Sequence, residues 1–150
     1  MLPFDPLVIE QRISDVSRFW QTLSEAALQH PPAPGKWSRK EILGHLIDSA
    51  QTNIRRLIVG QYQAQAHIVY EQNAWVQAVG YNTYPSADLL QLWVLLNRHF
   101  IRVATQLPAD KLGALTNWGR DKPELVPLSL IIEDYVLHLD HHLKQLYQVA

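Results

Sequence analysis

The sequence predicts an all-α protein, a four-helix bundle with long loops after the second and third helices. Apolar residues recur at alternating spacings of four and three in the long segments, which is the period of one face of an amphipathic helix. Prolines and glycines collect between these segments and mark the connections. The 150 residues, 47% of them hydrophobic, suffice for one domain with a real core, so we expect a single domain over 1–150.

The first helix is expected to begin at Asp5, whose side chain can cap it, with Pro6 at the first helical position. Its apolar face follows the four-three spacing over Ile9, Ile13, Val16, Trp20, Leu23 and Ala27. The prolines and the glycine of 31–35 should end it. We therefore expect one continuous helix up to this proline-rich stretch.

The second helix has a strong start signal. Ser38 and Glu41 have the spacing of a capping box, and Trp37 and Ile42 are placed for a hydrophobic staple. The helix should run to about Gln61 and carries a polar stripe made of His45, Asp48, Thr52 and Arg56. Because the apolar residues lie on nearly the opposite side, the stripe is either a solvated surface or the lining of a polar cleft between helices.

The connection over 63–85 is rich in aromatic residues, and we expect a short helical turn near 71–78 whose aromatics cover one end of the fold. Ser86 can cap the third helix, which runs to Pro108 on four-three spacing. Prolines and glycines make 108–127 a long loop, with a brief extended piece around 115–118.

The fourth helix, expected over 128–149, carries three of the seven histidines. His138 and His142 lie one turn apart, about 40° around the axis, with β-carbons about 5–6 Å apart. Both imidazoles could therefore reach one metal ion. His141 instead shares a side with Asp134 and Gln145, so we expect it not to bind the metal.

Composition excludes several classes of function. A net charge of −1 gives no reason to expect a nucleic acid or an anionic membrane as partner. The chain has no cysteine, so it has no disulfide, thiolate ligand or cysteine nucleophile. We read no signal peptide and no membrane span, and we expect a cytoplasmic protein. Metalloprotease motifs, a phosphate-binding loop and a nucleophile elbow are missing.

Several short motifs resemble the DinB/YfiT-like superfamily of metalloenzymes. They are Trp37-Ser38, the run 44–49 with Asn53 and Arg56, Tyr70-x-Gln72-x-x-Trp75, and His138-x-x-His141-His142-x-x-Gln145-Leu146. The resemblance spans about 37–146 and implies a four-helix bundle that binds a divalent metal through three histidines. Those positions match His45, His138 and His142, so the resemblance favours a polar stripe that lines a cleft.

The resemblance also implies a reaction class. Some relatives transfer a low-molecular-weight thiol such as bacillithiol, mycothiol or glutathione, so we expect a thiol transferase or hydrolase that acts on a small molecule. Zinc, nickel and iron all suit imidazole ligands. Asp48 and Arg56 are candidates for orienting a ligand or the substrate, or form a surface ion pair. A metal-binding stress protein without turnover, and a helical interaction module, including a homodimer, stay open as alternatives.

Overall fold

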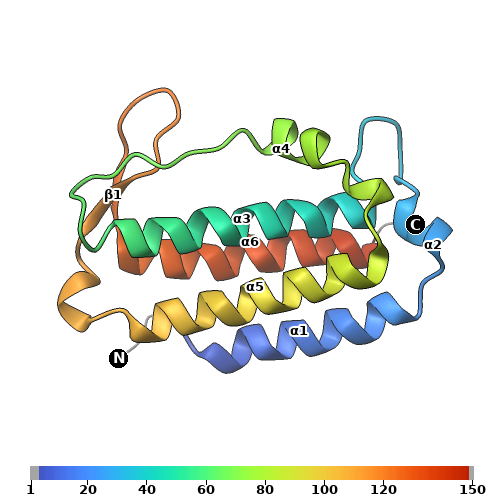
Figure 1. The fold of residues 1–150 in the computed structure, drawn as a ribbon, viewed down its shortest axis with the longest axis horizontal. Helices are drawn as coiled ribbons and strands as arrows, with labels where there is room; N and C mark the ends of the chain where they lie inside the picture. Colours follow the sequence, from blue (N-terminus) through green and yellow to red (C-terminus); the bar gives the residue numbers. More distant parts are fainter. Residues whose placement is uncertain (1–3, 149–150) are drawn as a thin grey trace.

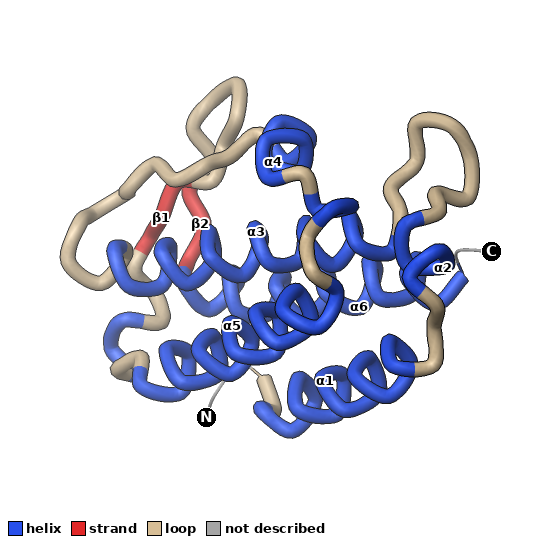
Figure 2. Tube along the Cα trace, turned by 45° about the vertical axis from the view of Figure 1, so that its right-hand side comes forward, coloured by secondary structure: helices blue, strands red, loops and turns tan. Residues whose placement is uncertain are grey.

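A computed structural model describes residues 4–148 and confirms the four-helix bundle (Figures 1 and 2). Its long helices are α1 (Pro6–Gln21), α3 (Arg39–Val59), α5 (Ser86–Gln106) and α6 (Leu128–Gln148). Helix α3 packs against α5 and α6, and α5 packs against α1. Arg12 of α1 donates twice to Asp140 of α6, which joins the remaining pair of helices. Val149, the expected end of the last helix, lies outside the described residues.

Helix α3 lies at the centre of the bundle. The capping box is confirmed, because Ser38 Oγ accepts from the Glu41 N–H while the Glu41 carboxylate accepts from the Ser38 N–H at 2.9 Å. Every residue from 42 to 50 is buried. The polar stripe therefore lies inside the molecule at His45, Asp48 and Thr52, and its reading as a solvated surface is wrong.

The first predicted helix is wrong in one respect, because it is broken into two. Helix α1 ends at Gln21, and a short helix, α2 (Glu25–Gln29), follows. The Thr22 hydroxyl donates to the Phe19 carbonyl at 2.6 Å, and the Ser24 hydroxyl accepts from the first turn of α2. Local side-chain bonds of this kind compete with helix continuation and start a new helix.

The predicted cap of the third helix is also wrong. Pro85 takes the N-cap position of α5, and Ser86 is already the first helical residue. The Ser86 hydroxyl donates to the Glu25 carboxylate of α2 instead, at 2.5 Å. This charge-assisted bond holds the Ser86 side chain against α2, and no side-chain cap bond forms at the start of α5 within residues 4–148. Lys40 donates to the same carboxylate at 2.7 Å, which ties α2, α3 and α5 together.

The segment between α3 and α5 runs along α3 and contains the expected short helix, α4 (Gln72–Val79), followed by the 3-10 turn η1 (Tyr81–Thr83) (Figure 1). Two of its aromatic residues pack against neighbouring positions in the first half of α3. Tyr81 is buried against Gly44 of α3, and the ring of Tyr70 stacks 6.5 Å from that of His45. The connection thus covers the side of α3 that no long helix covers.

The loop after α5 holds a second 3-10 turn, η2 (Ala109–Lys111), and a small hairpin (Figure 2). The expected extended piece is strand β1 (Leu115–Asn117), which pairs antiparallel with an unpredicted strand, β2 (Leu125–Pro127). Ile68 donates from the earlier connection to the carbonyl of Asn117, so the two long loops are joined. Within residues 4–148, no helix combines the length and apolar character needed to cross a bilayer.

Gly44 is required by the ring of Tyr81. A Cβ at this position would lie 2.0 Å from Tyr81 Cδ2. We predict that Gly44→Ala lowers the free energy of unfolding by about 1–3 kcal/mol through overpacking, although alanine favours helices by about 1 kcal/mol. Urea unfolding followed by circular dichroism measures this. Gly113→Ala is the control, since a Cβ added at Gly113 would meet no neighbouring atom of residues 4–148 within 4 Å. A Gly44→Ala protein as stable as wild type would contradict this packing.

Candidate metal centre

The three histidines matched by sequence lie together between α3 and α6. His45 Nε2 and His138 Nε2 are 3.2 Å apart, and the ring centroid of His142 lies 4.5 Å from the centroids of both other rings. One ring nitrogen from each histidine lies within 4.8 Å of the others. Nitrogens bound to one ion at 2.0–2.1 Å are about 3.0–3.5 Å apart. The cluster therefore fits a three-nitrogen metal site after small ring rotations.

Contacts at Nδ1 leave Nε2 as the nitrogen that His138 and His142 can offer to a metal. His142 Nδ1–H donates to Gln145 Oε1 at 2.9 Å, so its Nε2 keeps the free lone pair. His138 Nδ1 lies 3.4 Å from Ser49 Oγ, on the side of the ring away from His45. In metal sites the second ring nitrogen normally bonds to an oxygen in this way. The buried Nδ1 of His45 has no such partner among residues 4–148.

The imidazoles are held in their neutral form. Burial, reinforced by the neighbouring histidines, lowers the pKa of His45 to about 3 and that of His138 to about 4. Burial also lowers the pKa of His142. The ring of Trp37 lies 4.8 Å from that of His45 and 6.2 Å from that of His142, and shelters them further. Neutral imidazole is the form that binds metals, so the ligands need not lose a proton first.

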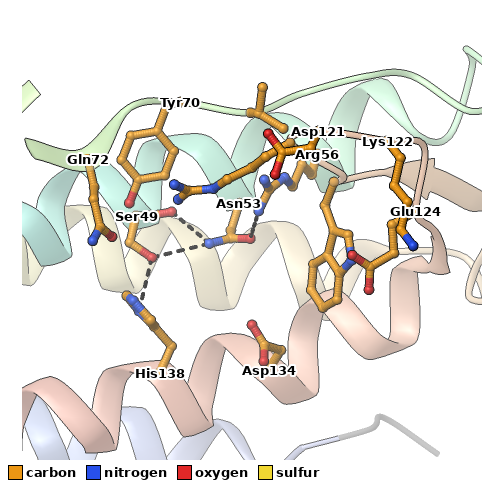
Figure 3. A pocket seen from close by; sticks show the side chains of 13 residues that line it. Ser49, Asn53, Arg56, Tyr70, Gln72, Asp121, Lys122, Glu124, Asp134 and His138 are labelled. Carbon is orange, nitrogen blue, oxygen red and sulfur yellow. Dashed lines mark hydrogen bonds between the residues drawn. The ribbon is translucent and has the colours of Figure 1, made fainter. Parts of the chain in front are cut away.

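Two clefts reach the cluster from different sides. The larger, of about 790 Å³, is bordered by His138 and by polar residues of α3 and of both long loops (Figure 3). The smaller, of about 530 Å³, is bordered by His142 and Trp37. A small molecule could therefore approach the ring nitrogens through a cleft.

A chain of hydrogen bonds forms one wall of the larger cleft (Figure 3). It starts at His138 and passes through Ser49 Oγ, which lies 3.2 Å from Asn53 Nδ2. Asn53 Oδ1 then accepts from Arg56 Nη1 at 3.1 Å. Arg56 Nε and Nη2 donate to the Ile68 carbonyl at 3.0 and 2.7 Å. The candidate residue Arg56 thus lines the cleft in a fixed orientation.

Asp48, the other candidate, lies behind the histidines. Its carboxylate is buried, accepts from the Tyr81 hydroxyl at 2.5 Å, and lines neither of the two clefts. Burial raises the pKa of Asp48 to about 6. Among residues 4–148 no ion pair joins it to Arg56, so the alternative of an Asp48–Arg56 surface pair is wrong. The hydrogen bond that it accepts from the Tyr81 hydroxyl holds Tyr81 against α3.

His141 is exposed and is not one of the three clustered histidines. Its Nε2 lies 3.4 Å from the amide nitrogen of Gln145. Sequence reasoning assigned no role at the metal centre to Ser49 or Gln145, and it gave Trp37 only a place in the hydrophobic staple. Ser49 follows His45 by four residues and Gln145 follows His142 by three, so helical spacing places each on the same face as a clustered histidine. This helical spacing was the sequence signal that could have indicated Ser49 and Gln145.

The lowered pKa values predict an acid-sensitive fold in the metal-free protein. Below about pH 6.5 the imidazole of His45 is protonated in the unfolded chain but stays neutral in the folded protein. The free energy of unfolding that is present above pH 6.5 is therefore lost as the pH falls. His45 alone should remove about 2 kcal/mol between pH 6.5 and 5. His138 and His142 act in the same direction, and Asp48 partly opposes them because its pKa is raised.

Urea unfolding with a chelator at pH 7, 6 and 5 measures this loss. The control is His45→Gln, whose pH dependence should be shallower by about one proton. Stability that stays constant or rises toward pH 5 would contradict the neutral, buried state of these rings.

The fold and the histidine cluster can now be compared with known proteins. The chain matches the family model of the DinB superfamily over residues 9–146. It is also similar to the structure of YfiT from Bacillus subtilis, with a TM-score of 0.85 and 19% sequence identity over 96% of this chain and 82% of that one. YfiT is described as a probable metal-dependent hydrolase with an unusual four-helix bundle topology. No curated protein matches. Because the family match spans nearly the whole chain, the protein belongs to the DinB superfamily.

Proposed function

We propose that the chain is a divalent-metal-dependent enzyme that acts on a small molecule, with His45, His138 and His142 as the metal ligands. The observation that carries this proposal is the cluster of three neutral imidazoles whose nitrogens lie within 4.8 Å of one another beside two clefts. Three protein nitrogens leave coordination positions for a water or a substrate, which is the arrangement of catalytic rather than structural sites. The description of YfiT as a probable metal-dependent hydrolase supports the same class.

The bound ion would act as a Lewis acid that lowers the pKa of a coordinated water or thiol. The protein's own residues supply position and shelter. Ser49 and Gln145 orient the rings of His138 and His142, and Trp37 limits the access of water to one side of them. Tyr70 borders the larger cleft, and burial raises its pKa to about 12, so its hydroxyl stays protonated and can donate to a substrate.

The nucleophile is either water, which gives a hydrolase, or a low-molecular-weight thiol, which gives a transferase. The absence of cysteine means that an attacking sulfur must come from such a thiol, for example bacillithiol, mycothiol or glutathione. Imidazole ligands suit zinc, nickel and iron, and we propose one of these as the metal. Both reactions use the same ligands and differ only in what fills the free position.

The first test of this function is metal binding. We predict one divalent ion per chain, and His142→Ala should weaken binding by about 100-fold or more, because losing even a residue that supports a ligand costs 10–100-fold. Elemental analysis of protein purified without a histidine tag gives the stoichiometry, and competition with a chelator gives the affinity. His141→Ala is the matched control on the same turn and should bind as wild type does. Equal loss in both variants would show that the assigned face is wrong.

The second test is turnover. Metal loading should accelerate either hydrolysis in a panel without thiol, or consumption of an electrophile in the presence of glutathione, bacillithiol or mycothiol. The rate should rise with pH through one ionisation, because the deprotonated water or thiol is the nucleophile; a zinc-bound water would titrate at about 7. Metal-free protein and His142→Ala are the controls. If no metal changes any rate between about pH 6 and 9, the protein binds metal without turnover.

A further inference from the structure

Arg56 of α3 is a half-buried cation. Three of its five N–H groups are used, by the Ile68 carbonyl and by Asn53, which leaves one N–H on each terminal nitrogen. Among residues 4–148, no carboxylate lies within ion-pair distance of the guanidinium. Asp134 acts on this charge only through space, so an anion in direct contact with the guanidinium would stabilise it further. The two remaining donors match the two oxygens of a carboxylate.

The position of Arg56 relative to the histidine cluster is fixed. The hydrogen bonds from His138 to Ser49, Asn53 and Arg56 measure 3.4, 3.2 and 3.1 Å and follow one wall of the cleft (Figure 3). Three such bonds and one amide group place the guanidinium on the order of 10 Å from His138. Arg56 and His138 also border the same cleft. One extended small molecule could therefore contact both.

Other charges in the cleft limit the kind of anion. Five further charged residues line it, all of them exposed: Arg120, Asp121, Lys122, Glu124 and Asp134. With Arg56 the lining holds three bases and three acids, so it has no net positive charge to balance a dianion, and the single anchored cation matches a monoanion. A carboxylate is therefore favoured over a phosphate. Arg56 is distinguished from the other two bases because it is sheltered and its side chain is already anchored.

We propose that Arg56 binds a carboxylate of the substrate, and that this carboxylate lies on the order of 10 Å from the atom that reaches the histidine cluster. The carboxylate site is inferred from the position and the hydrogen bonds of Arg56 alone. Only the placement of the opposite end of the substrate rests on the proposed function. The substrate class is then a small, extended carboxylic acid that carries a metal-binding or reactive group at its far end.

The carboxylate site can be tested without metal. In metal-free protein, hexanoate should shift the ¹⁵N–¹H signals of Arg56 Nε and of the Asn53 side-chain amide in a saturable way. Arg56→Gln should abolish the Asn53 response, and Arg56→Lys should retain only part of it, because lysine lacks the fixed pair of donors. Arg55→Gln is the matched control: it removes an exposed positive charge from the next position of α3. If wild-type protein shows no saturable shift at Arg56, or prefers hexylphosphonate to hexanoate, the proposal is overturned.

The span is tested with cobalt-loaded protein and ω-mercapto carboxylic acids of increasing length. Thiolate–cobalt absorption reports binding at the metal, independently of turnover. Beyond the length that reaches Arg56, each acid should bind about tenfold more tightly than the alcohol of equal length. Arg56→Gln should remove that preference and Arg55→Gln should keep it. The proposed distance between the two sites is refuted if both variants prefer the acid over the alcohol equally, or if that preference is the same at every chain length of the probe.

The two tests separate the two proposals. If no probe produces thiolate–cobalt absorption because cobalt does not bind, the proposed metal function fails while the hexanoate titration still decides the role of Arg56. If cobalt and thiols bind but Arg56→Gln changes nothing, the metal function survives and the carboxylate site fails.

Discussion

The burial of nine consecutive residues in the first half of helix α3 is the constraint on which the rest of the structure depends. Nine consecutive residues, 42–50, are buried, and they include polar side chains. Buried polar groups need partners, so the surrounding elements must supply them. Tyr81 of the long connection donates to Asp48, and His138 of α6 contacts both His45 and Ser49. The polar interior therefore decides how the connection and α6 sit against α3.

The same enclosure determines the chemistry of the histidines. Burial lowers the pKa of His45 and His138 far enough that both are neutral at physiological pH. An exposed cluster with the same spacing would carry partial positive charge and would repel a cation. Packing on two rigid helices also limits how far the nitrogens can separate when no ion is present. A fold that shelters polar residues thus creates ligands that are ready to bind.

Local sequence signals predicted most of the fold. Ser38 and Glu41 start α3 as expected, because a capping box is decided by two residues only three positions apart. The break at 22–24 and the bond from Ser86 to Glu25 were not predictable, since each depends on a competition between local and tertiary hydrogen bonds. The helical spacing of the histidines predicted the pair on α6. The amphipathic pattern of α3 misled for His45, because it assumes a solvent-facing side that residues 42–50 do not have.

The metal centre and the clefts are built from different parts of the chain, and this division bears on how function could vary within the fold. The three histidines stand on two long helices, whereas much of the larger cleft is formed by Tyr70, Gln72 and the hairpin loop 118–124. Loops accept substitutions that helices in a packed core do not. A chain that keeps the helical positions can therefore keep its metal chemistry while its loops select another substrate. Arg56 stands on α3 itself and donates to the Ile68 carbonyl of the first long loop, so the position of its charge depends on both the helix and that loop.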